Sequence, residues 1–68
     1  MESVKDRVSK ERDELAERIS RLSGFLHSER AAQISAHQVE LLEVQLHVMI
    51  AYERILNMRL DDMRYNHS

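Results

Sequence analysis

Residues 39–63 decide how this chain folds; they read VELLEVQLHVMIAYERILNMRLDDM. On a helix that turns about 100° per residue, one set of apolar side chains in this stretch forms a single stripe. That stripe, which only Glu53 interrupts, consists of Val39, Leu42, Leu46, Met49, Leu56, Leu60 and Met63. A second apolar set lies on a neighbouring face and consists of Leu41, Val44, Val48, Ala51, Ile55 and Met58. The stretch therefore predicts a helix with two apolar faces.

The start of this helix carries its own signal. Ser35 and Gln38 form an S-x-x-Q capping box, and Ile34 is placed to pack against Val39 as a hydrophobic staple. We therefore expect the second helix over residues 35–65, with a length of about 45 Å at 1.5 Å per residue.

The N-terminal part predicts a second, simpler helix. Ser3 is a suitable N-cap, and Asp6 lies in the first turn, where the helix dipole favours a negative charge. The apolar positions make one stripe with a gap at Glu11 and Arg12; they are Val4, Val8, Leu15, Ile19, Leu22 and Leu26. These features predict a helix over about residues 3–27.

A short linker, residues 28–34, separates the two expected helices, which favours an antiparallel hairpin. The predicted fold class is therefore all-α, with residues 1–68 forming one helical domain. A 68-residue chain without cysteine has no disulfides to stabilise it, and chains of this size usually need partner subunits. Because the first helix can cover only one face of the second, we expect a homo-oligomeric helical bundle.

Composition excludes several classes of function. The net charge is −2, from 10 basic and 12 acidic side chains without a basic stripe, so DNA or RNA binding is not expected. The chain has no apolar run long enough to span a membrane and no signal-peptide pattern at its start, so we expect a cytoplasmic protein. No nucleophile constellation and no H-E-x-x-H spacing occur, so neither an enzyme nor a metal site nor a cofactor is expected.

A line of polar residues runs between the two apolar faces. It consists of positions seven residues apart, namely Gln38, Gln45, Tyr52, Arg59 and Asn66. Polar positions beside apolar surface often set the register of an oligomer. Tyrosine and arginine together can also stack on a base and bind a phosphate. Both interpretations of this line remain open at this stage.

Several motifs resemble a family of small phage helical proteins. In the second helix they are Glu40-Leu41-Leu42, Gln45-Leu46, Met49, Tyr52, Ile55-Leu56 and Arg59-Leu60; in the first they are Arg7-Val8, Glu14-Leu15, Ile19, Leu22 and Phe25-Leu26. The family includes the anti-CBASS type 2 sponges of cyclic oligonucleotides. The resemblance implies a hexamer in the host bacterial cytoplasm that binds cyclic GMP–AMP or cyclic tri-AMP without cleaving it.

The resemblance also implies ligand-binding positions. Arg59 matches the arginine of the family's L-x-x-R-L segment, which contacts the ligand. Arg12 stands where the family has a base-stacking aromatic, and His27 stands near the position of a pocket lysine. With Tyr52 and Gln45 from the polar line, these are the candidate ligand-binding residues. An alternative is a non-catalytic helical adaptor or structural phage protein that binds a protein partner through its apolar surface.

Overall fold

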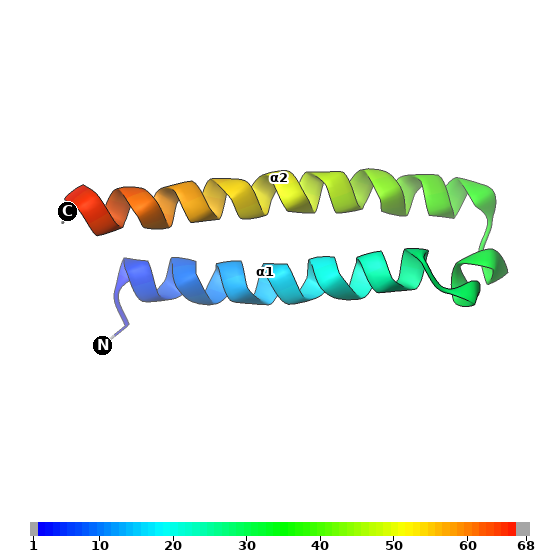
Figure 1. The fold of residues 1–68 in the computed structure, drawn as a ribbon, viewed down its shortest axis with the longest axis horizontal. Helices are drawn as coiled ribbons and strands as arrows, with labels where there is room; N and C mark the ends of the chain where they lie inside the picture. The colour runs from blue at the N-terminus through cyan, green and yellow to red at the C-terminus, as the bar shows by residue number, and fades with distance from the viewer. Residues whose placement is uncertain (1, 67–68) are drawn as a thin grey trace.

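The computed structural model describes residues 2–66, with side chains described as far as Arg64. The elements are helix α1 (Val4–Leu26), the 3-10 helix η1 (Glu29–Gln33) and helix α2 (Ala36–Asn66). The two long helices lie side by side and run in opposite directions, with η1 joining them at one end (Figure 1). The predicted all-α antiparallel hairpin is confirmed, and both helices lie within one residue of their expected ranges.

Local sequence explains where the helices begin. At α1, the Ser3 hydroxyl accepts a hydrogen bond from the Asp6 amide at 3.1 Å, and the Asp6 carboxylate accepts one from the Ser3 amide at 3.3 Å. This reciprocal box gives Asp6 a more specific role than the dipole interaction expected from sequence. At α2, the Ser35 hydroxyl accepts a hydrogen bond from the Gln38 amide at 3.1 Å. Both helix starts therefore follow from serine caps that the sequence displays.

The interface between the helices is narrow. Its buried residues are Val8 and Leu15 from α1 and Leu56 from α2, and the Leu56 side chain is 0% exposed. Partly buried side chains pack around them, namely Ile19, Met49, Leu60 and Met63. Members of the stripe predicted for each helix thus meet in this core, and α1 covers only that face of α2.

The second apolar face of α2 stays exposed. We call it the exposed seam; it consists of Leu41, Val44, Val48, Ala51, Ile55 and Met58, each classed as exposed. Val48 is 62% exposed and Met58 is 63% exposed, values unusual for large apolar side chains in a folded chain. Within residues 2–66, no helix is long and apolar enough to cross a membrane.

Candidate functional site

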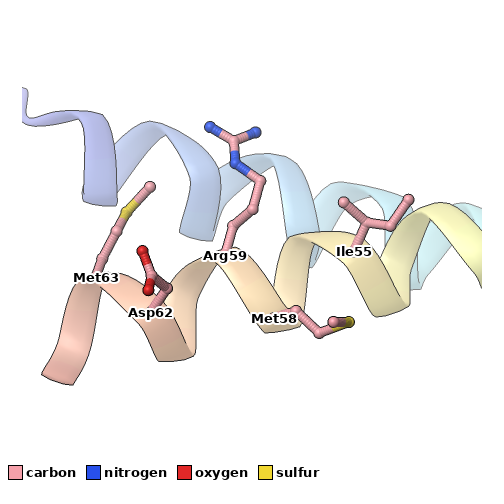
Figure 2. A pocket seen from close by; sticks show the side chains of 5 residues that line it. All are labelled: Ile55, Met58, Arg59, Asp62 and Met63. Carbon is pink, nitrogen blue, oxygen red and sulfur yellow. The ribbon is translucent and has the colours of Figure 1, made fainter. Parts of the chain in front are cut away.

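Arg59 lies in an open apolar hollow near the C-terminal end of α2. The hollow has a volume of about 350 Å³ and is lined by Ile55, Met58, Arg59, Asp62 and Met63. Figure 2 shows these side chains on successive turns of α2, with the Arg59 guanidinium reaching away from its helix. That volume falls at the lower end of the range for small-molecule pockets, which begins at about 300 Å³.

The guanidinium of Arg59 makes no hydrogen bond or ion pair with the side chains that the structure describes. Such a group beside apolar walls can bind a phosphate bidentately or stack on a planar base. The Asp62 carboxylate on the same wall reduces the local positive charge. The hollow is therefore suited to a ligand that combines an apolar, planar surface with an anionic group.

Arg12 is held in the helix interface. Its Nη1 donates a hydrogen bond to Asn57 Oδ1 at 3.0 Å, and its Nε donates to Asp13 Oδ1 at 2.9 Å. The side chain is only 34% exposed. The gap in the stripe of the first helix is therefore a position where a polar side chain bridges α1 and α2. Arg12 also borders a polar hollow that contains Lys5, Ser9, Leu60, Asp61 and Arg64.

Arg12 and Arg59 lie on opposite flanks of the hairpin. Arg12 reaches Asn57, which precedes Arg59 by two positions and therefore points about 200° away from it around α2. The two guanidiniums therefore border different hollows of the same chain.

His27 lies at a third place, next to the connection between the helices. It borders a hollow together with Leu26, Glu43, Leu46 and His47. Leu46 precedes Arg59 by 13 residues on α2, which corresponds to about 20 Å along the helix. One chain therefore does not bring His27 together with Arg59.

His47 borders this hollow together with His27, although it is not among the candidate residues that the sequence predicted. Nδ1 of His27 lies 2.7 Å from the Ser23 carbonyl oxygen. Nδ1 of His47 lies 2.8 Å from the Glu43 carbonyl oxygen. A carbonyl oxygen only accepts hydrogen bonds, so each Nδ1 carries the proton and each Nε2 is left for other partners. No sequence signal reveals the pair, because it depends on how the two helices are aligned.

Gln45 and Tyr52 remain on the surface of α2. Gln45 donates a weak hydrogen bond to the Met49 sulfur at 3.9 Å, and Tyr52 is 41% exposed. Both lie on the same flank of α2 as Arg59, since the three positions are seven residues apart. Asn66, the last position of the polar line, has a side chain outside the described part. Among the described residues, no group of three or more His, Asp or Glu side chains is placed to hold a metal ion.

The Arg12–Asn57 contact gives a first prediction. A double-mutant cycle with Arg12→Ala and Asn57→Ala should give a coupling of about 1 kcal/mol in urea unfolding, because the hydrogen bond joins the two helices. The matched control is the exposed Glu17–Arg21 ion pair within α1, for which about 0.3 kcal/mol is expected. A coupling near zero for Arg12 and Asn57 would show that Arg12 is not committed to this contact.

The fold and these hollows define a small helical hairpin with an exposed apolar face and open hollows on α2. The chain belongs to the Sequestin family, whose model matches residues 2–62. This match includes all five candidate residues, Arg12, His27, Gln45, Tyr52 and Arg59. No curated protein matches the chain. No solved structure matches it either.

Proposed function

We propose that this chain is a phage anti-defence sponge of the anti-CBASS type 2 kind. It binds cyclic dinucleotide or trinucleotide second messengers in the host cytoplasm and lowers their free concentration without cleaving them. The family match over residues 2–62 carries this proposal, since the family's name refers to sequestration. The Arg59 hollow supports it, because it sets an apolar wall beside a guanidinium that has no partner among the described side chains, which suits a base and a phosphate.

The proposed sponge works as a homo-oligomer, with a hexamer as the expected assembly. Arg59, Arg12 and His27 lie at separate places on one chain. A cyclic oligonucleotide with several bases and phosphates can contact them together only if different copies supply them. The exposed seam offers the surface for such an assembly.

Sequestration requires binding energy and stoichiometric amounts of protein, but no chemical step. We therefore expect the bound nucleotide to be recovered intact by chromatography after denaturing the protein. Recovery of linear or hydrolysed product from purified protein would contradict a non-catalytic function.

Native mass spectrometry with a mixed panel of cyclic oligonucleotides tests the proposal most directly. We expect an oligomer that gains the mass of cyclic GMP–AMP or cyclic tri-AMP. At a ligand concentration 100-fold above Kd, binding should add about 2.7 kcal/mol of stability. That corresponds to a rise in Tm of more than 10 °C for a chain of this size.

Linear dinucleotides of the same composition serve as the control. They should give neither bound mass nor a rise in Tm, since they have no fixed ring to fit a shared pocket. No bound mass and no thermal shift across the whole panel would overturn the proposal.

A second candidate function rests on the exposed seam alone. An unpartnered helix face of this kind can bind an amphipathic segment of another protein, so an adaptor is the alternative. A host protein recovered at equal stoichiometry, together with no response to cyclic nucleotides, would favour the adaptor over the sponge.

A further inference from the structure

The exposed seam has the spacing of a coiled-coil interface. Leu41, Val48 and Ile55 are seven residues apart, and Val44, Ala51 and Met58 follow each of them by three. These are the a and d positions of a heptad repeat, on a face of α2 that α1 does not cover. In the same repeat, the polar line Gln38, Gln45, Tyr52 and Arg59 occupies the flanking e positions.

We propose that the exposed seam packs against the exposed seam of a second copy in antiparallel orientation, about a two-fold axis near Met49 and Ile50. This arrangement refines the proposed homo-oligomer by defining its interface and by completing the surroundings of Arg59. It rests on the geometry of α2 and requires no nucleotide.

Antiparallel pairing matches the seam to itself. It places Leu41 against Met58 of the second copy, Val44 against Ile55 of the second copy, and Val48 against the small Ala51 of the second copy. Each layer combines side chains of compatible size, as tight packing requires. The seam is also nearly centred on α2 (Ala36–Asn66), so antiparallel helices overlap along almost their whole length.

Parallel pairing in register is less favourable because it brings like charges together. It would place Asp62, the next a position, beside Asp62 of the second copy, and Arg54 beside Arg59 of the second copy. Antiparallel pairing places Asp62 across from His37 of the second copy instead. Antiparallel pairing also has a like-charge contact on its flank, Asp61 near Glu40 of the second copy, and water and salt screen it as they would screen Arg54 beside Arg59. The Asp62 pair at the a position therefore decides against parallel pairing.

The second copy also contributes to the candidate site. In this register the polar lines face each other, so Tyr52 meets Gln45 of the second copy and Arg59 meets Gln38 of the second copy. Leu41 and Val44 of the second copy cover Met58 and Ile55, so pairing closes that side of the hollow and leaves Arg59, Asp62 and Met63 at its edge. At this edge, Gln38 of the second copy adds a neutral amide that can both donate and accept hydrogen bonds. The polar line then sets the register and contributes to the site, which unites the two interpretations left open by the sequence.

The size of the seam fits a second copy. Its half-exposed side chains together with Tyr52 present on the order of 600 Å² of apolar surface per copy. Pairing two copies would bury on the order of 1,200 Å² in total, the lower limit for stable interfaces. Among the described residues of the hairpin only Val8, Leu15 and Leu56 are buried, and only Leu56 is buried completely. A core this small favours further burial against a second copy.

Single cysteines test the orientation, because the chain has no cysteine of its own. Leu41→Cys and Met58→Cys are coexpressed, purified without nucleotide and oxidised, and the disulfide-linked species are identified by mass. Antiparallel pairing predicts that the mixed Leu41→Cys/Met58→Cys dimer exceeds either symmetric dimer by at least fivefold. A control pair on the side of α2 away from the seam, Glu43→Cys with Asn57→Cys, should give only background crosslinking.

Symmetric dimers from each variant alone would show parallel pairing and overturn the proposal. Crosslinking no stronger than that of the control pair would overturn it as well, provided that circular dichroism shows the variants to be helical. Because no nucleotide is present, either failure leaves the nucleotide panel as a separate test of the proposed function.

Discussion

Arg59→Ala is expected to remove about half or more of the thermal stabilisation by cyclic oligonucleotides while leaving the subunit number unchanged. The guanidinium has no partner among the described side chains, so its removal should cost the free protein little stability. In the complex it is expected to make charge-assisted hydrogen bonds to a phosphate, each worth about 1.5–3 kcal/mol. The loss corresponds to a Kd weakened by about 10- to 100-fold, measured by isothermal titration calorimetry.

The matched control for this prediction is Arg54→Ala. Arg54 is an exposed arginine on the same helix but lies on the polar side, outside the Arg59 hollow. Arg54→Ala removes the same charge from the chain as Arg59→Ala, so any long-range electrostatic effect on ligand binding should be equal in both variants. Equal weakening by the two variants, or full binding by Arg59→Ala, would remove Arg59 from the site.

Leu56→Ala is expected to have the largest effect on stability. Its side chain is 0% exposed and lies in the core with Val8 and Leu15. Truncating a buried leucine costs about 2–5 kcal/mol. A core in a chain this short rarely supplies more than about 3–5 kcal/mol. We therefore expect Tm to fall by more than 10 °C, or the hairpin to unfold, as measured by circular dichroism.

The neighbouring variant Ile55→Ala separates the two faces of α2. Ile55 is 53% exposed and belongs to the exposed seam, so its loss should weaken contact between copies. Its destabilising effect should therefore be greatest at high protein concentration and shrink as dilution separates the copies, whereas Leu56→Ala should destabilise at every concentration. Similar, concentration-independent losses for both variants would mean that the two faces of α2 do not differ in this way.

Much of the fold could be predicted because its signals are local. The Ser3 and Ser35 caps act within three residues, and the apolar spacing of each helix identifies the face that is buried. The presence of a second apolar face on α2 was equally predictable, since the heptad spacing of Leu41, Val48 and Ile55 is visible in the sequence. The candidate site was less predictable, because its residues lie on different helices.

The sequence by itself therefore determined two helices, their ends, and the division of α2 into a covered face and an exposed seam. Only the tertiary structure decided that Arg12 bonds to Asn57, that His27 and His47 border the same hollow, and that Arg12 and Arg59 lie on opposite flanks. The physical reason is that caps and apolar periodicity depend on neighbours along one helix. Contacts across the hairpin depend on the axial and rotational alignment of two helices, which the connection near η1 and the packing around Leu56 fix together.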